Sequence, residues 1–534
     1  MRRLARIVVA LLGLAFLLAG AGAAAYVGSD DTVFTRPADL GADGRPVLTA
    51  PDLLAWDGLT VTLRAQAPGG VFIGTAHPVD VADFVGDSPR VRLEGVTRDG
   101  VLAAEVGTGR PRHPEDADFW TRSMSGPGPQ ELTLDRSTAA VQWVIAPLGG
   151  VGPTTVSFGI TVDGAYVAAL GVAGVGLLLL VLAVELLRPR RSRRTRGPHD
   201  GESPGAAASP VRRGGARKAE RPGRRTRATA VSLAAVLLAG GCQLPRPSTE
   251  ASATTARSKV SLTEADLPAL YDSYDRRRAR AVAASGPPAY RDGAWRSVDR
   301  GLALDVDRYE TAARRLMALR PPSAPAHTGE RVYAARFDAY PMWAMVAART
   351  PGSDPELHVL VRDSVTSPWL LEARTDVTGD LPDPGRPTVL PTGAARGAAI
   401  AARDAWAAYL TGGGDADGLD VDDASRAWRR AMSDLGSRTI FRDWGVAATP
   451  VDAPVRVVDV ADGRLAVVAL RVVTRLRGRP DLAVRWNPPY TRLRAGRDGV
   501  LVVDELAVGL VHLPDRGRPA LVGSTFSEVP AGVR

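Results

Sequence analysis

The chain has 534 residues, a net charge of +9 at pH 7 and one cysteine. A single cysteine excludes an intrachain disulfide, so each folded part must be held by its own hydrophobic core. The positive charge is local: residues 188–227 hold fourteen basic and three acidic residues, a net charge of +11, which leaves −2 for the rest (9 − 11). This distribution excludes a uniformly basic protein, and we expect no nucleic-acid partner.

Two apolar segments are long enough to cross a hydrocarbon core of about 30 Å. Residues 7–25 follow a short N-terminus, residues 1–6, that holds three arginines and is expected to be cytoplasmic. Residues 165–187 contain one charged side chain. We predict a transmembrane helix over each segment. The small residues that end the first one, Ala21 to Ala25, leave open the alternative of a cleaved signal peptide.

Between these segments, residues 26–164 have the patterns of β-strands. Thr60 to Ala65 and Val91 to Val96 alternate between apolar and polar residues, and Ala140 to Ile145 is a largely apolar run. Asp99-Gly100 between two such runs is a strong hairpin signal. We predict an extracytoplasmic all-β, sandwich-like domain.

A short stretch of this region, Asp118 to Gly126 followed by a strand from Glu131, carries a family resemblance. With a span on each side, residues 1–190 resemble uncharacterised membrane proteins of actinobacteria, and the resemblance implies no activity. The chain has two lysines and sixty-five arginines (67 − 2), a bias that is typical of proteins from high-GC bacteria. Phe119 and Trp120 are either an exposed ligand platform or, more commonly for such residues, core or edge-covering aromatics.

The basic stretch, residues 188–227, sets the predicted orientation. Its arginines keep it on the cytoplasmic side, where it also meets membrane lipid headgroups. Its Gly, Pro, Ser and Arg composition predicts a disordered linker. We therefore expect a multi-pass plasma-membrane protein with both large regions on the extracytoplasmic face.

A third apolar segment, residues 228–242, is shorter and has the length of a signal-peptide core. It follows an arginine cluster and ends in Leu238-Ala239-Gly240-Gly241-Cys242, which resembles a bacterial lipobox, although Ala239 stands where leucine is commoner. We predict lipidation of Cys242; the alternative is that Cys242 only ends a short third membrane helix. Residues 243–261, rich in Ser, Thr, Ala and Pro, form the predicted tether.

An internal repeat predicts two tandem α+β domains. The fourteen residues from Leu304 match those from Leu419 at eight positions, an offset of 115 residues (419 − 304). In each copy an aspartate, Asp307 or Asp422, is placed to N-cap a helix. A helix precedes this element and strands follow it, an order that resembles the NTF2/cystatin-like cone folds. The predicted domains are residues 262–378 and 394–530.

Enzyme signatures are absent from the sequence: it has no HExxH, GxSxG or P-loop motif and no Cys/His cluster, and its six histidines are scattered. His77, Asp80 and Asp83 could meet at a metal, but a strand and turn with solvated carboxylates explains them equally well. The acidic residues from 415 to 423 are out of EF-hand register and are expected to form a solvated loop. We predict no catalytic, cofactor or metal site.

The expected function is that of a non-enzymatic cell-envelope membrane protein. It would act as an extracytoplasmic binding or scaffolding module for an unknown envelope protein or cell-wall ligand. One alternative is an envelope enzyme acting on cell-wall or lipid material, whose carboxylates or histidines meet only in the fold. Another is a lipid or small-ligand carrier, by analogy with the pockets of cone-shaped folds.

Overall fold

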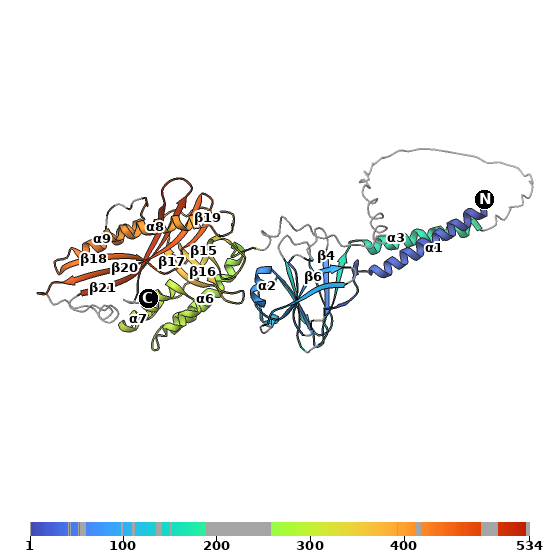
Figure 1. Cartoon of the computed structure of the whole chain (residues 1–534), viewed down its shortest axis with the longest axis horizontal. Coiled ribbons are helices and arrows are strands. Elements are labelled where there is room, and N and C mark those ends of the chain that lie inside the picture. The colour runs from blue at the N-terminus through green and yellow to red at the C-terminus, as the bar shows by residue number, and fades with distance from the viewer. Residues whose placement is uncertain are drawn as a thin grey trace, which may run out of the picture. The chain divides into compact units, whose positions relative to one another are not determined.

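The computed structural model describes residues 2–40, 42, 44–51, 53, 60–97, 100–108, 113–134, 141–149, 152–187, 258–391, 393–412, 414, 416, 418–481 and 500–529 (Figure 1). It is a mixed α/β protein with several sheets that divides into two compact units. The first unit comprises Met1–Thr75, Ser88–Glu115 and Arg122–Ser248, and the second comprises Ala76–Asp87, Asp116–Thr121 and Thr249–Arg534. Residues 188–257, with the predicted linker, third apolar segment and most of the tether, lie outside the described residues.

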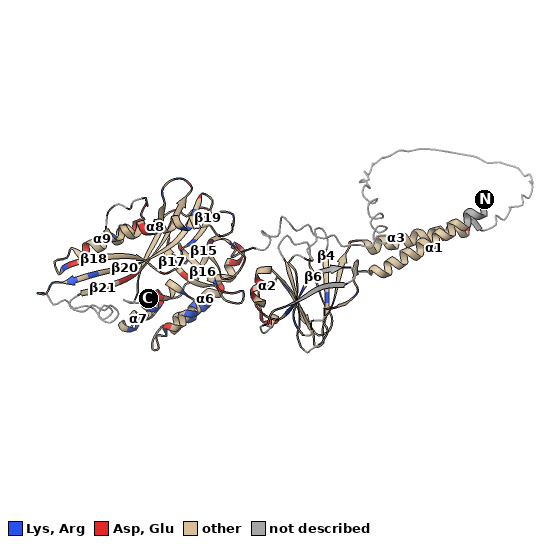
Figure 2. Ribbon diagram, in the orientation of Figure 1, with Lys and Arg blue, Asp and Glu red and all other residues tan. Residues whose placement is uncertain are grey.

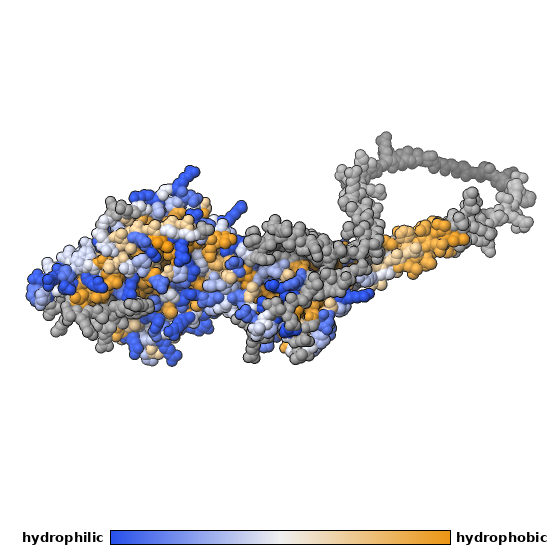
Figure 3. Space-filling view, viewed as in Figure 1, coloured by the Kyte–Doolittle hydropathy of each residue, from blue (hydrophilic) through white to orange (hydrophobic). Residues whose placement is uncertain are grey.

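Two helices of the first unit, α1 (Arg2–Val27) and α3 (Ala165–Leu187), are long and apolar enough to cross a membrane. Their apolar side chains are largely exposed, as the hydrophobic surface in Figure 3 shows; Leu18 is 64% and Leu178 is 69% exposed. A core helix of a water-soluble protein hides such side chains. The exposure therefore fits helices that are solvated by lipid.

The helices α1 and α3 pack against each other through glycines. A Cβ atom added at Gly20 would lie 2.3 Å from the backbone nitrogen of Ala173. A Cβ atom added at Gly176 would lie 2.3 Å from the backbone nitrogen of Leu17. Only a residue without a side chain permits this approach, which is how helices associate closely in membranes.

The strands of the first unit form a β-sandwich. One sheet has the order β1-β11-β4-β9, with β2 paired to β11, and the other has the order β7-β6-β3-β10-β5-β8. Val61 and Leu63 from the first sheet share one core with Trp143 and Ile145 from the second. The predicted hairpin is present, since β6 and β7 are antiparallel neighbours. The strands are β1 (Thr32–Phe34), β2 (Ala38–Asp39), β3 (Val47–Thr49), β4 (Thr60–Gln66), β5 (Val71–Ala76), β6 (Arg90–Thr97), β7 (Gly100–Val106), β8 (Arg122–Gly126), β9 (Gln130–Leu134), β10 (Gln142–Pro147) and β11 (Thr155–Thr161).

One prediction for this region is wrong: a helix, α2 (Pro78–Val85), stands where a strand and turn were expected. Pro78 occupies the start of the helix, where its missing N–H is not needed. The N–H of Val79 donates to Nδ1 of His77 (3.2 Å), which caps the helix. Local capping chemistry therefore decided this segment, and α2 belongs to the second compact unit.

The second unit contains two segments with the same order of elements, two helices followed by a mostly sequential antiparallel sheet. The sheet orders are β13-β15-β16-β17 and β18-β20-β21-β22, with β19 paired to β20. The first segment holds β12 (Lys259–Val260), α6 (Leu267–Ala284), α7 (Gly301–Met317), β13 (Thr328–Ala334), β14 (Arg336–Phe337), β15 (Met342–Arg349), β16 (Glu356–Arg362) and β17 (Leu370–Asp376). The second holds α8 (Gly393–Gly412), α9 (Asp423–Gly436), β18 (Phe441–Pro450), β19 (Arg456–Val460), β20 (Gly463–Gly478), β21 (Val500–Pro514) and β22 (Ala520–Glu528).

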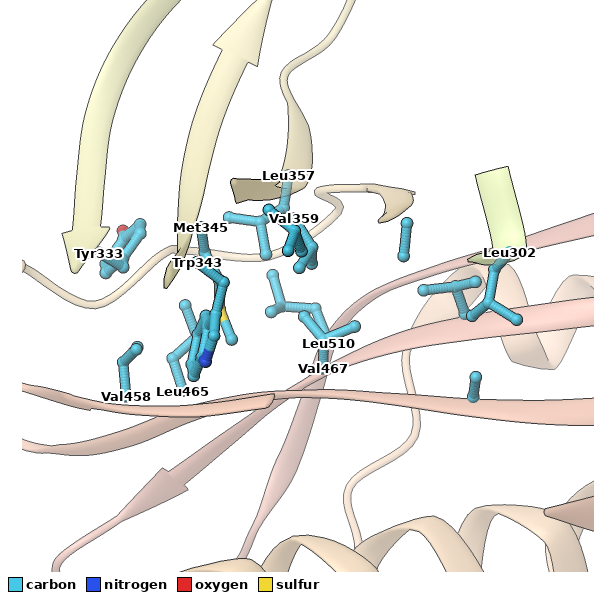
Figure 4. Packing of buried hydrophobic residues seen from close by; sticks show 14 of the residues in the cluster. Leu302, Tyr333, Trp343, Met345, Leu357, Val359, Val458, Leu465, Val467 and Leu510 are labelled. Carbon is cyan, nitrogen blue, oxygen red and sulfur yellow. The ribbon is translucent and has the colours of Figure 1, made fainter. Parts of the chain in front are cut away.

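The two sheets of the second unit share one hydrophobic core, in which Trp343 and Met345 of β15 meet Leu465 and Val467 of β20 (Figure 4). The alternate residues of the same strands face the other way. In the first sheet they pack under α6, and in the second under α8. Both sheets are therefore buried on both faces, which explains why their strands read as nearly continuous apolar runs.

The predicted helix start in the first repeat is also wrong. Helix α7 begins at Gly301, after an extended Arg300, so that Asp307 lies within the helix. Leu302 and Val306 pack into the core between the sheets, and this burial extends the helix toward its N-terminus. In the second segment Asp422 does cap α9, since it accepts a hydrogen bond from the N–H of Ser425 (3.0 Å).

Candidate functional site

The residues weighed as metal ligands do not converge. His77 caps α2, Asp80 is bonded to Lys259 (Oδ2 to Nζ, 2.6 Å), and Asp83 accepts a hydrogen bond from the N–H of Val365 (2.8 Å). Asp80 is also buried, so it is no solvated carboxylate. In the part of the chain that the structure describes, no group of three or more His, Cys, Asp or Glu side chains is arranged to hold a metal ion.

The predicted lipidation site, Cys242, lies outside the described residues. The aromatic pair Phe119 and Trp120 is half-buried and packs on Phe84 of α2, with ring centroids 5.2 and 5.6 Å away. These contacts favour edge-covering aromatics over a ligand platform. Of the acidic run, Asp422 is buried as a helix cap and Asp423 lies in the first turn of α9.

Two of the scattered histidines meet in the fold, and they form the candidate functional site. His358 lies on β16 and His327 immediately precedes β13, and their ring centroids are 5.2 Å apart. Helix α6 covers them with Tyr271 and Tyr274. We call these four residues the histidine–tyrosine cluster.

A hydrogen-bond chain runs through the cluster. Nδ1 of His358 lies 3.1 Å from the hydroxyl of Tyr271, and Nε2 lies 3.4 Å from Oε2 of Glu356. Burial, followed by the nearby Asp275 and Glu356 carboxylates, raises the pKa of Tyr271, so the phenol keeps its proton and donates to Nδ1. Nε2 then carries the ring proton and donates to the carboxylate.

The electrostatics of the chain favour a neutral imidazole beside an ionised carboxylate. The hydrogen bond from His358 lowers the pKa of Glu356 to about 2. Burial lowers the pKa of His358, and although the Glu356 hydrogen bond opposes this effect, burial prevails. His358 is only 1% exposed.

The second histidine is held by one carboxylate. Oδ2 of Asp275 accepts from the backbone N–H of His327 (2.8 Å), and Oδ1 lies 2.6 Å from Nδ1 of the ring. The ring also stacks on Tyr271, with centroids 5.7 Å apart. Asp275 is on α6, so this contact fixes the helix to the strand that follows His327.

A buried acid lies near the cluster. Asp299 is 2% exposed, and neither of its carboxylate oxygens makes a hydrogen bond of regular geometry. Burial, and then the neighbouring carboxylate of Asp307, raises the pKa of Asp299 to about 9. Asp307 itself lies 3.4 Å from the guanidinium of Arg374 on β17. Asp299 is therefore a neutral acid at pH 7, beside an ion pair.

The second segment has a buried polar network that joins α8, α9 and β22. Asp422 accepts from the hydroxyl of Ser524 on β22 (2.8 Å), whose oxygen lies 2.9 Å from that of Ser425. The indole of Trp406 donates to Ser425 (3.0 Å). All four side chains are buried. The Asp422 carboxylate and both serine hydroxyls are engaged in buried hydrogen bonds, so the network fits a role in packing α9 on its sheet.

The cluster of the first segment has the residue types of an acid–base relay, a carboxylate, an imidazole and a phenol in sequence. A relay needs access for a substrate, however, and Tyr271 is 2% exposed. The described residues of the cluster also include no serine or cysteine nucleophile. The geometry therefore fits a network that fixes α6 to its sheet better than it fits an active site.

Sequence reasoning missed this cluster, although one signal was present. Tyr271, Tyr274 and Asp275 are spaced i, i+3 and i+4, which puts them on one face of a helix. No sequence pattern relates that face to His327 or His358. Comparisons of the chain with protein-family models, curated proteins and solved structures found no match.

Proposed function

We propose that the chain is a non-enzymatic envelope protein anchored in the plasma membrane, whose second unit acts outside the cell as a binding or scaffolding module. The anchor is the pair α1 and α3, which hold no charged residue from Ile7 to Val27 or from Ala165 to Val184, whereas acidic and basic residues are spread along the second unit (Figure 2). The expected partners are membrane lipid and an envelope protein or cell-wall ligand.

One contact carries the topological part of the proposal. Asp80 precedes α3 in the sequence and Lys259 follows it, yet their side chains are 2.6 Å apart within the second unit. Residues in contact lie on the same side of a bilayer. If α3 crosses the membrane, the chain must cross back within residues 188–257, where the apolar segment 228–241 lies. This supports a position of both regions on the same face of the membrane, and the arginines of residues 188–227 favour the extracytoplasmic face.

Labelling with a membrane-impermeant maleimide tests this topology. Single cysteines replace the exposed Asp87 and Asp338 in the second unit and Ser209 in the basic linker. We expect labelling at the first two positions in intact cells, and at Ser209→Cys only after lysis. The parent chain controls for Cys242. Labelling of Ser209→Cys in intact cells would contradict the proposal.

Lipidation of Cys242 is part of the same proposal, because a diacylated cysteine anchors a chain that a fourteen-residue apolar segment (241 − 228 + 1) holds poorly. Immunoblots for the C-terminus test it, with a signal-peptidase II inhibitor and with Cys242→Ala. If the chain is processed, the blot shows a shorter C-terminal product. Both treatments should prevent the cut and leave the full-length chain in its place. A full-length band under all conditions would mean that Cys242 only ends a third span.

We also infer that residues 262–378 and 394–530 are tandem copies of one α+β fold of the NTF2/cystatin-like kind. Their common order of elements supports this. In both copies the matched aspartate contacts the last strand of its sheet, Asp307 through Arg374 and Asp422 through Ser524. Superposing experimental structures of the two segments, with Leu304 over Leu419, tests the inference.

The enzyme remains the second candidate, because the chain Glu356–His358–Tyr271 has the order of an acid–base relay. Incubating the purified chain and its His358→Gln variant with peptidoglycan and with phospholipid separates the two functions. Turnover that is lost in His358→Gln at an unchanged melting temperature would favour the enzyme. Co-purification from membranes without turnover supports the binding module and would identify its partner.

A further inference from the structure

Helix α2 is encoded far upstream of the rest of the second unit, yet it is bonded into that unit. Asp80 is 3% exposed and receives two hydrogen bonds, from Nζ of Lys259 (2.6 Å) and from the hydroxyl of Tyr340 (2.8 Å). Burial, and then Asp80, raises the pKa of Tyr340, so the phenol remains a donor. A buried carboxylate with two donors of this kind is costly to leave unpaired.

Two further contacts hold the same helix. Val79 is 4% exposed and belongs to the core between the two sheets, the core that contains Trp343. One turn further along α2, Asp83 accepts a hydrogen bond from the backbone N–H of Val365 (2.8 Å). Helix α2 therefore contributes an apolar side chain and two carboxylates to the second unit, as an interface does between separate proteins.

We propose that α2 is a docking element: it holds residues 258–529 by non-covalent contact, independently of the covalent connection through residues 188–257. The proposal rests on the proposed function, in which both exported regions lie on the outer face. If the chain is cut before Cys242, the C-terminal product stays bound to the two-span product through Val79, Asp80 and Asp83.

The test uses the full chain in membranes, with a site for a sequence-specific protease inserted between Ser252 and Ala253. This position follows Cys242, so a lipid on that residue stays with the N-terminal fragment. After cutting on spheroplasts and washing, the C-terminal fragment of the parent chain is expected to sediment with the membranes. Asp80→Ala and Lys259→Ala are each expected to lower the sedimenting fraction at least about tenfold, since about 1.4 kcal/mol suffices for a factor of ten.

Asp87→Asn is the matched control, because Asp87 lies two residues beyond α2 and is exposed. This variant should sediment like the parent chain. The C-terminal fragment released from the Asp80→Ala chain carries no substitution itself. Its melting temperature shows whether it is folded, and so distinguishes loss of docking from unfolding. Release of the parent fragment on cutting would overturn the proposal, as would retention of both variants at the parent level. Maleimide labelling reports the topology whether or not the C-terminal fragment stays on the membrane. A failure of docking is therefore distinguishable from a failure of the proposed topology.

Discussion

Asp31 caps helix α3, which begins more than 130 residues later in the sequence: its Oδ1 accepts a hydrogen bond from the backbone N–H of Tyr166 (2.6 Å). Its Oδ2 accepts one from the N–H of Gly164 (2.9 Å). These groups lie at the N-terminus of α3, where backbone donors lack partners within the helix and a negative charge is favourable. Asp31 lies four residues after the end of α1. A residue that closely follows one candidate span therefore caps the first turn of the other.

The close packing of α1 on α3 at Gly20 and Gly176 favours retention of α1 over its cleavage as a signal peptide. We expect mass spectrometry of the purified chain to detect peptides from residues 7–25. Asp31→Ala should lower the free energy of unfolding in detergent by about 1 kcal/mol, the usual cost of a lost cap. The neighbouring exposed Asp30 provides the control, Asp30→Ala. A mature N-terminus at Tyr26 would contradict the prediction.

Gly20 tests the pairing of the two spans. A side chain at this position would collide with the backbone of Ala173, whereas one at Gly22 would meet no atom within 4 Å. Gly20→Leu is therefore expected to lower the melting temperature in detergent and to separate α1 from α3, and Gly22→Leu to do neither. Equal melting temperatures for the two variants would exclude the contact between α1 and α3 as a determinant of stability.

Acidification should destabilise the histidine–tyrosine cluster. Burial lowers the pKa of His358 in the folded state, so its contribution to stability is complete above the unfolded value of 6.5 and is lost as the pH falls through the folded value. We expect the melting temperature of the second unit to fall from pH 7 to pH 5, and the fall to be smaller in His358→Gln. His113 is exposed, and His113→Gln should keep the parent slope.

Alkaline pH should destabilise the chain through Asp299. Because its pKa is raised from 3.8 to about 9, the folded state holds a proton that the unfolded chain releases, and stability falls as the pH rises between these values. Asp299→Asn keeps the shape and removes the ionisation. At pH 8 it should raise the free energy of urea unfolding by several kcal/mol, since each pH unit above the unfolded pKa contributes about 1.4 kcal/mol.

At pH 4 the parent chain and Asp299→Asn should differ little in stability, since this pH is close to the unfolded pKa of 3.8 and the pH-dependent loss has barely begun. The exposed Asp338 supplies the control, Asp338→Asn, which should change neither value. Tryptophan fluorescence reports the transition, because Trp295 and Trp343 are buried in the same unit. A difference of the same size at pH 4 and pH 8 would refute the assignment.

Much of the local structure was predictable, because it depends on neighbours in the sequence. Apolar length alone indicated the two candidate spans, and α3 covers the residues that were expected. The hairpin that was predicted at Asp99-Gly100 corresponds to the antiparallel neighbours β6 and β7. Predictions of helix starts were less reliable. Asp307 has the chemistry of a cap, but burial of Leu302 starts the helix earlier.

Composition and periodicity alone determined which segments of this protein are apolar, which are strands and where positive charge gathers. Tertiary structure alone decided that His327 and His358 meet beneath α6, that Asp299 lies beside Asp307, and that Asp80 bonds to Lys259. The physical reason is that periodicity reports whether a side chain is buried but carries no information about what it is buried against. A pKa shift, an ion pair or a docking contact depends on that second residue, which the fold supplies.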